Sequence, residues 1–346
     1  MSEIPKRTNS ENETSSRCLV PELSQCTLDT YARLWQFETW LRRLVYIELR
    51  ALVGDGWALK VKGAQKPKEN DKRLTHMPTP EENLLSYAQL SELRSIISEN
   101  WRLFEPFLLP RNIWEAKLDE VSQVRHRVAH FRSGHADDLQ RVTQLLRDLD
   151  KGFWRFCTSF NDSGPVLPQS DDPIESQFLH LDQFPWSPVG EKKWARIGSA
   201  DPSVRLGVTV EVLCRPWVRW EPPIIGKEGF LYCVRVHGRQ NRVFDYKRLL
   251  EQTRNVHKHI VYICLERDFS SFEITLPAIL GESQIIEIVK QVLDDALSCC
   301  LTSCVFGQGP ANNAQSLADE WPEHVLGPEN PLTFLCPDMP CSFFGA

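Results

Sequence analysis

NIWEAKLDEVSQVRHRVAHF, residues 112–131, is the segment from which the first half of the chain can be interpreted. Its apolar residues recur at steps of four, three and seven, which is the spacing of one face of an α-helix: Trp114, Leu118, Val121 and Val128. The segment therefore predicts one amphipathic helix. Arg125 lies on the apolar face, at a position where the period predicts another apolar side chain.

Two histidines accompany Arg125 in this segment. His130 follows it by five positions, and five residues advance an ideal α-helix by about 500°, so the two side chains should lie about 140° apart. His126 comes one turn before His130 and shares its side of the helix. The predicted helix thus carries a cationic, imidazole-rich arc beside its packing face.

This arc allows two interpretations. In the first, Arg125 pairs with a carboxylate and the histidines are surface residues, which is the better expectation for an isolated Arg or His on a helix. In the second, the arc binds a phosphate or phosphodiester, because Arg binds phosphate oxygens in a bidentate way and imidazole can move a proton. We favour the second, because Arg125 interrupts the stripe and small Ala129 leaves room for close approach. Two more arginines add positive charge: Arg127 and Arg132.

The sequence RHRVAH at residues 125–130 resembles the Arg-x4-His motif of the HEPN superfamily, the higher eukaryote and prokaryote nucleotide-binding domains. The segment WLRRLVYIELRALVGDGW, residues 40–57, is similar to the opening helix of the toxin and defence branch of that family. The resemblance covers about residues 27–161 and implies a helical bundle. Many members are metal-independent ribonucleases of toxin–antitoxin, CRISPR-associated or anti-phage systems. The family often has Asn after the Arg, whereas this chain has His126.

The resemblance implies an endoribonuclease in which Arg125 and His130 are catalytic and His126 has a supporting role. Cleavage of single-stranded RNA would use the 2′-hydroxyl as nucleophile and leave a 2′,3′-cyclic phosphate, without a metal or cofactor. One copy of the arc suits this chemistry poorly because its Arg and His diverge. We therefore expect a homodimer in which two motif helices, and the opening helices with them, surround one phosphodiester.

Two other functions remain open. The alternative is a non-catalytic module that acts as an RNA-binding or scaffold subunit of a larger defence complex. Another is a toxin silenced by a modifying antitoxin. The nucleotidylated branch of the family carries a Tyr two residues after the motif His, and Arg132 occupies that position here, which argues against this form of control.

Composition sets outer limits on these hypotheses. The chain has 346 residues, a length that favours two domains. Of these residues 42% are hydrophobic and 25% are charged, which is typical of an ordinary globular protein, and the net charge is −6. That charge argues against non-specific coating of nucleic acid. The 11 scattered cysteines and the polar first residues predict free thiols and a cytoplasmic location. No run of about 18 apolar residues occurs, so we expect no contact with a membrane.

We expect a multidomain protein in which an all-α, HEPN-like helical bundle precedes an α+β domain. Residues 1–26 should form a flexible arm, and the bundle should cover 27–161 and begin with Thr27 as a helix N-cap. Residues 60–73 predict a polar loop, either a solvated flap or an RNA-binding loop with these phosphate contacts: Lys60, Lys62, Lys66 and Lys68. We also expect Arg127 and Arg132 to contact RNA. The sequence TPEE at residues 79–82 predicts another helix start.

The second half of the chain changes its period. We expect three parts: a linker and irregular segment at 162–195, an α+β domain at 196–306, and a Pro- and Gly-rich tail at 307–346. Alternating apolar residues predict strands at 204–212, 230–236, 260–265 and 272–276, and helical spacing predicts helices at 245–255 and 283–303. No Gly-rich phosphate loop, nucleophile elbow or metal-ligand spacing is present. We expect this domain to sense a trigger or to select the target.

Overall fold

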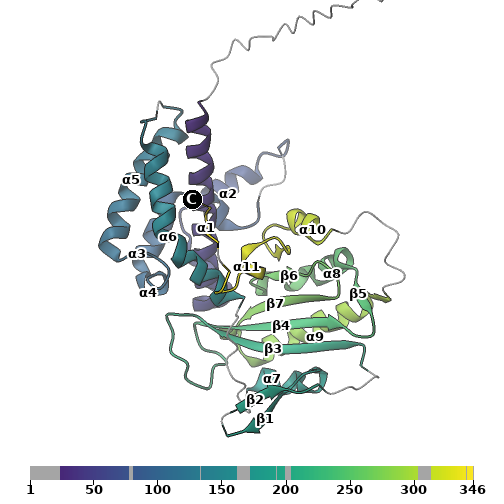
Figure 1. Cartoon of the computed structure of the whole chain (residues 1–346). Helices are drawn as coiled ribbons and strands as arrows, with labels where there is room; N and C mark the ends of the chain where they lie inside the picture. Colours follow the sequence, from purple (N-terminus) through teal and green to yellow (C-terminus); the bar gives the residue numbers. More distant parts are fainter. Residues whose placement is uncertain are drawn as a thin grey trace, which may run out of the picture.

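The computed structural model describes residues 24–77, 81–132, 134–161, 172–191, 193–198, 204–302, 313–339 and 341–345. An N-terminal helical region precedes a region with a mixed sheet and helices, as the sequence predicted (Figure 1). Most of the predicted arm and the first part of the predicted linker lie outside the described residues. No described helix is both long enough and apolar enough to cross a lipid bilayer.

The opening helix α1 (Gln25–Val53) is the central element of the helical region. It begins at Ser24, so the prediction of Thr27 as N-cap was wrong: the Ser24 hydroxyl accepts a hydrogen bond from the Thr27 backbone N–H at 3.2 Å. Its second half is buried continuously from Leu44 to Ala51, because α1 contacts helices on several sides. Fully buried apolar side chains line it: Phe37, Leu41, Leu44, Val45, Ile47 and Leu49.

A short, polar excursion follows α1. It contains the 3-10 helix η1 (Gly54–Lys60), the α-helix α2 (Gln65–Lys72) and the 3-10 helix η2 (Leu84–Tyr87). The prediction of a continuous loop over 60–73 was therefore wrong, although α2 buries none of its residues. The predicted helix start at 79–82 falls partly outside the described residues, and Asn83 caps η2 instead by accepting from the Leu85 N–H at 2.9 Å.

The remaining helices complete the bundle around α1: α3 (Leu90–Glu99), α4 (Trp101–Phe104), α5 (Arg111–Ala129) and α6 (Asp138–Phe160). The motif helix α5 ends at Ala129, two residues before the predicted end. Its buried stripe also differs at the last position, because Val124 is buried whereas Val128 is only half-buried. Arg125 follows Val124 directly and lies where the buried face gives way to the surface.

The sheet of the second region has the strand order β3-β4-β7-β6-β9. Its strands are β3 (Leu206–Cys214), β4 (Phe230–Gly238), β7 (Ser271–Pro277), β6 (Ile263–Leu265) and β9 (Val325–Leu326). All neighbours are antiparallel except β6 and β9, which are parallel. The helices α8 (Tyr246–Gln252) and α9 (Glu282–Ser298) pack with the sheet in one apolar core (Figure 1).

Four predicted strands are thus present as β3, β4, β6 and β7, but several elements were not predicted. The segment expected to be irregular contains a hairpin of β1 (Trp186–Gly190) and β2 (Lys193–Arg196), which follows α7 (Pro173–Phe178) and the 3-10 helix η3 (Leu179–Leu181). A second pair joins β5 (Arg242–Phe244) to β8 (Cys300–Thr302), so the helix predicted over 283–303 ends early. Two more 3-10 helices are η4 (Thr253–His259) and η5 (Ala278–Leu280).

The expectation of a tail at 307–346 needs correction for its described part. Residues 313–339 form α10 (Ala314–Glu320), strand β9 and α11 (Pro331–Phe334), and β9 is an edge strand of the main sheet. Farther on, Phe344 packs against Phe153 of α6 with ring centroids 5.2 Å apart, and its carbonyl oxygen accepts a hydrogen bond from Arg33 of α1 at 2.8 Å. The described part of the predicted tail therefore contributes a strand to the sheet and also packs against the bundle.

One hydrophobic core joins the bundle to the sheet, since residues of both contribute to it. At this junction Glu48 of α1 forms a fully buried ion pair with Arg215, which follows β3. The Trp217 indole N–H donates to the same carboxylate at 2.6 Å, and Arg215 donates to the Ser159 carbonyl oxygen at 2.9 Å. Removal of one partner from such a pair costs about 3–5 kcal/mol because the other charge stays buried.

Candidate functional site

The end of α5 positions the predicted site residues. The backbone N–H of Phe131 donates to the Val128 carbonyl oxygen at 3.1 Å, and that of Arg132 donates to the Arg127 carbonyl oxygen at 3.0 Å. These two bonds define a Schellman motif, in which the residue after the cap adopts a left-handed conformation and is usually Gly. Here that residue is Phe131, with φ = 53° and a side chain that is 93% exposed.

The helix end changes the predicted relation between the motif residues. His130 is the C-cap at φ = −103°, so it leaves the ideal helix from which the angle of about 140° was calculated. The expectation that His126 and His130 share a side is confirmed, because their ring centroids are 4.4 Å apart. Both imidazoles are exposed. They therefore form an accessible pair beside Arg125 rather than a pair of isolated surface groups.

Arg125 has a partner that the sequence did not indicate. Its Nε lies 3.2 Å from Oε1 of Glu38 on α1, a carboxylate that is only 8% exposed. The other oxygen of Glu38 lies 2.8 Å from Nη2 of Arg42, which also donates to the Ala88 carbonyl oxygen. One buried carboxylate thus orients two guanidinium groups, and the local charge remains positive. The interpretation of Arg125 as a carboxylate partner is confirmed, and it is compatible with a phosphate site because Arg has five N–H donors.

A groove of about 810 Å³ lies between the start of α1 and the end of α5. Three arginines line it: Arg42, Arg125 and Arg132. Its other walls carry exposed aromatic side chains, with Tyr31 58%, Trp35 62% and Phe131 93% exposed. Positive charge combined with exposed aromatic rings is the composition of surfaces that bind single-stranded nucleic acid, because rings stack on bases and arginines contact phosphates.

The environment of His126 makes its neutral form more stable. Desolvation is the largest cause, followed by the positive charges of His130, Arg132 and Arg125, and together they lower the pKa of His126 from the ordinary value of 6.5. A larger fraction of this imidazole is therefore unprotonated near neutral pH and able to accept a proton. The site thus contains a proton acceptor, a second imidazole and an oriented guanidinium at one helix end.

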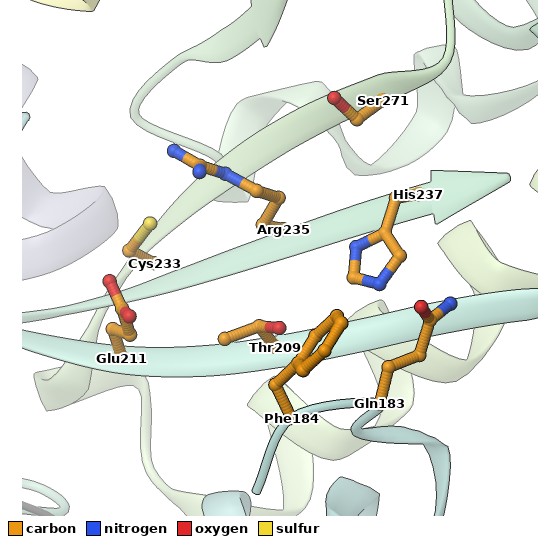
Figure 2. A pocket seen from close by; sticks show the side chains of 8 residues that line it. All are labelled: Gln183, Phe184, Thr209, Glu211, Cys233, Arg235, His237 and Ser271. Atoms are coloured by element: carbon orange, nitrogen blue, oxygen red, sulfur yellow. The ribbon is translucent and has the colours of Figure 1, made fainter. Parts of the chain in front are cut away.

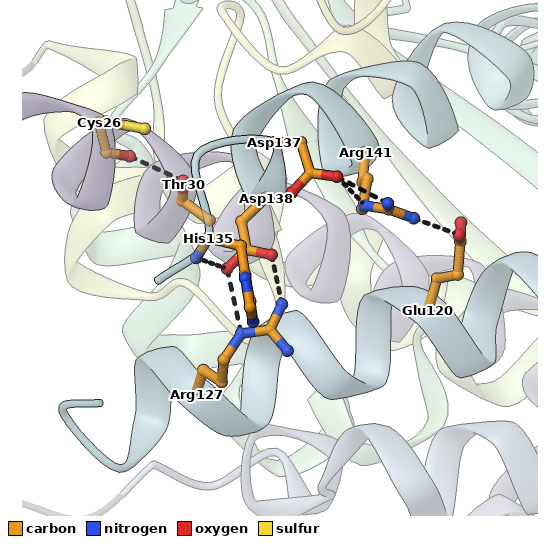
Figure 3. A network of polar contacts seen from close by, with 8 residues as sticks. All are labelled: Cys26, Thr30, Glu120, Arg127, His135, Asp137, Asp138 and Arg141. Carbon is orange, nitrogen blue, oxygen red and sulfur yellow. Dashed lines mark hydrogen bonds and ion pairs between the residues drawn. The ribbon is translucent and has the colours of Figure 1, made fainter. Parts of the chain in front are cut away.

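Arg127 has a structural position, in contrast to its predicted RNA contact. Its Nε donates to Asp138 Oδ2 at 3.1 Å, and the same buried carboxylate accepts from the His135 backbone N–H at 2.9 Å (Figure 3). Burial raises the pKa of Asp138, but these hydrogen bonds outweigh it and the pKa is lowered overall. A neighbouring Arg141 bridges Asp137 and Glu120, so this network fastens the start of α6 to α5.

The lysines predicted to contact RNA lie on the excursion between α1 and α3. Lys60, Lys62 and Lys66 are exposed, and none of the four lysines lines the groove. Lys68 is half-buried, and its ammonium group donates to the Glu82 carbonyl oxygen. The structure therefore brings Arg125, His126, His130 and Arg132 together, but does not bring these lysines to them.

A second hollow, of about 440 Å³, lies on the face of strands β3, β4 and β7 (Figure 2). Arg235 donates to Glu273 there at 3.0 Å, and Cys233 and His237 lie along the same strand. Burial and the nearby carboxylates raise the pKa of the Cys233 thiol well above its usual value, while burial lowers the pKa of His237. A protonated thiol is a poor nucleophile, so the chemistry of this hollow favours binding over catalysis.

The end of α5 therefore carries a groove lined by oriented cations and, at neighbouring residues of the same helix end, a pair of exposed imidazoles. Comparisons of the whole chain with protein-family models, with curated proteins and with solved structures return no match.

Proposed function

We propose that this protein is a metal-independent endoribonuclease that cuts single-stranded RNA at the end of α5. The observation that carries the proposal is the pair of exposed imidazoles, His126 and His130, at the same helix end as Arg125. Arg125 itself lines a groove with exposed aromatic rings, and the two imidazoles lie outside the lining of that groove. The resemblance of residues 125–130 to the HEPN motif supports the same assignment and suggests a toxin or an anti-phage defence effector.

The chemistry needs a base, an acid and stabilisation of the developing charge. The 2′-hydroxyl of RNA is the nucleophile, an imidazole accepts its proton, and a second imidazolium protonates the leaving 5′-oxygen. The guanidinium of Arg125, oriented by Glu38, stabilises the charge on the phosphorane. The products are a 2′,3′-cyclic phosphate and a 5′-hydroxyl.

A homodimer provides the geometry that one chain lacks. In-line displacement requires the acid and the base at opposite edges of the phosphodiester, whereas His126 and His130 lie at one edge with centroids 4.4 Å apart. A second copy related by a twofold axis would supply the opposite imidazole. The exposed apolar side chains at the start of α1, such as Leu28 at 45% and Trp35 at 62%, offer a surface for this contact.

The decisive experiment measures cleavage of single-stranded RNA in EDTA. We expect Arg125→Ala and His130→Ala to abolish cleavage and to retain the native circular-dichroism spectrum. Arg147→Ala on α6 and His180→Ala in η3 are matched controls, since both side chains are exposed and lie outside the groove. Cleavage that survives both motif substitutions, or that requires a divalent ion, refutes the assignment.

A mixing experiment tests the composite site. A heterodimer of Arg125→Ala and His130→Ala chains retains one Arg125 and one His130 around the phosphodiester, so part of the activity should return on mixing. Two self-contained sites would leave the mixture inactive. Light scattering should show a dimer at micromolar concentration, and a monomer would contradict this part of the proposal.

The second candidate function is a non-catalytic RNA-binding or scaffold module in a larger complex, with an antitoxin among its partners. The pairing of Arg125 with buried Glu38 favours it, because a structural ion pair alone would explain that Arg. In this case RNA binding should persist without cleavage, and Arg125→Ala should weaken binding only in proportion to one lost phosphate contact.

A further inference from the structure

Three potential metal ligands meet far from the motif residues along the chain. One oxygen each from Glu82 and Glu323 and one ring nitrogen of His324 all lie within 4.8 Å of one another. Glu82 and Glu323 are 241 residues apart in the sequence, so no spacing rule could have revealed them. Glu82 precedes η2 in the helical region, and the other two residues precede strand β9 at the edge of the sheet.

Backbone contacts fix the positions of two of these residues. The backbone N–H of Glu82 donates to Oε1 of Glu323, which holds that carboxylate against the segment before η2. The carbonyl oxygen of His324 accepts a hydrogen bond from the Ile263 N–H at 2.8 Å, next to the pairing of β6 with β9. The Glu323 carboxylate also accepts a backbone hydrogen bond from Asn83. A carboxylate with two such bonds still has free lone pairs for a cation, and such outer contacts orient metal ligands.

The imidazole of the cluster has a ring nitrogen that its neighbours leave without a hydrogen bond. Nδ1 of His324 is buried and has no hydrogen-bond partner within the described part of the chain. The Glu82 carboxylate is exposed, and one of its oxygens lies within 4.8 Å of an oxygen of Glu323. Lys68 is the nearby cation, but its ammonium group contacts the Glu82 carbonyl oxygen. A buried ring nitrogen without a hydrogen-bond partner is costly unless a further group occupies the space beside it.

We propose that Glu82, Glu323 and His324 bind a first-row divalent metal ion such as Zn²⁺. Carboxylate oxygens and imidazole nitrogens bind Zn²⁺ at about 2.0–2.2 Å, so ligands of one ion lie about 3–4 Å apart. Separations of up to 4.8 Å close to this range by small side-chain rotations. The mixed oxygen and nitrogen set favours such an ion over Mg²⁺ or Ca²⁺, which prefer oxygen ligands alone. Exposed Glu82 leaves the remaining coordination position to solvent.

The site would fasten the helical region to the sheet. Glu82 belongs to the segment that connects α2 with η2, whereas Glu323 and His324 lead into the edge strand β9. An ion bound to all three therefore links these two segments, in addition to the hydrogen bond from Glu82 to Glu323. Its role is structural, and it is separate from the proposed cleavage chemistry at α5. The Lys68 ammonium group competes with the metal ion, because its positive charge partly neutralises the Glu82 and Glu323 carboxylates.

The test uses the full-length protein, stripped of metal by chelation and titrated with Zn²⁺ and with Co²⁺. We expect saturable binding by calorimetry and a rise in Tm with added ion. Glu323→Gln and His324→Gln should each weaken the affinity by at least about 10-fold, because even an outer-shell loss has that effect. Glu320→Gln on α10, an exposed carboxylate nearby in the sequence, is the matched control and should bind like the wild type. Lys68→Met should bind several-fold more tightly.

Three results would overturn the proposal. The first is equal binding by wild type and both ligand variants, provided that circular dichroism shows them folded. The second is a Co²⁺ complex with thiolate charge-transfer absorption, which would place the ion at cysteines. The third is weaker binding by Lys68→Met. RNA cleavage in EDTA is independent of all three, so failure of this proposal and failure of the ribonuclease proposal can be told apart.

Discussion

Phe131 tests whether the end of α5 is shaped for function rather than for stability. A residue with a side chain in the left-handed region costs about 1–2 kcal/mol, and Phe131 has φ = 53°. Its ring is 93% exposed, so truncation removes almost no buried surface. Phe131→Gly should therefore be more stable than Phe131→Ala by about 1 kcal/mol, because only Gly relieves the backbone while both variants lack the ring.

The RNA affinity of the two variants should not follow their stability. A base stacked on an aromatic side chain contributes about 1–3 kcal/mol, which corresponds to about 5- to 150-fold in affinity. Both variants should lose this factor in RNA affinity, and they should lose it equally because the ring is absent in each. Urea unfolding measures the stability difference, and fluorescence anisotropy with a labelled single strand measures binding. Phe334→Ala on α11, another exposed ring, is the control.

Two outcomes would refute this reasoning. Equal stability of the Gly and Ala variants would mean that residue 131 does not occupy the left-handed conformation. Wild-type RNA affinity in both variants would mean that the ring does not contact the substrate. A loss of affinity in Phe334→Ala as large as in Phe131→Ala would show that the assay responds to surface aromatic residues in general.

Three further changes probe the site and the fold. Glu38→Gln keeps a hydrogen-bond acceptor but removes the charge that orients Arg42 and Arg125. We expect kcat to fall about tenfold without a rise in KM. A raised KM with a normal kcat would contradict this. In the wild type the acidic limb of the pH–rate profile should lie below about pH 6.5, because the pKa of His126 is lowered. His126→Asn should reduce activity about tenfold and shift this limb. Flat pH–rate profiles in both proteins would contradict this prediction. Burial lowers the pKa of His257 to about 4, whereas the same histidine in the unfolded chain takes up its proton at a higher pH. The free energy of unfolding should therefore fall by about 2 kcal/mol from pH 7 to pH 5. Urea unfolding at both pH values should show a smaller loss in His257→Gln.

Strong local periodicity explains which elements of the fold could be predicted. The strands β3 and β7 alternate between the apolar core with α9 and the opposite face, and their sequences alternate accordingly. Strand β4 begins with five buried apolar residues, because both of its faces are covered there. Strand β9 could not be found this way, since it has two residues and exists only through its pairing with β6. Helix α2 was missed for the opposite reason: it buries no residue, so it has no apolar stripe to detect.

The same difference between local and long-range signals decides which residues of the candidate site could be predicted. Arg125, His126 and His130 lie within one short segment, so a sequence motif could suggest them. Glu38 could not be predicted, because its contact with Arg125 spans 87 residues and depends on how α1 packs against α5. The conformation of Phe131 was equally hidden, since a left-handed cap predicts Gly and the chain places an aromatic residue there.

The core shared by the bundle and the sheet has a consequence for the order of folding. A helical bundle built from local contacts folds quickly, but α1 completes its burial through partners 167 and 311 residues away, Arg215 for Glu48 and Phe344 for Arg33. Until Arg215 arrives, the Glu48 carboxylate must keep its water, and the second half of α1 stays open to solvent with it. The bundle should therefore reach its native state only together with the sheet, at the slower rate that strand pairing sets.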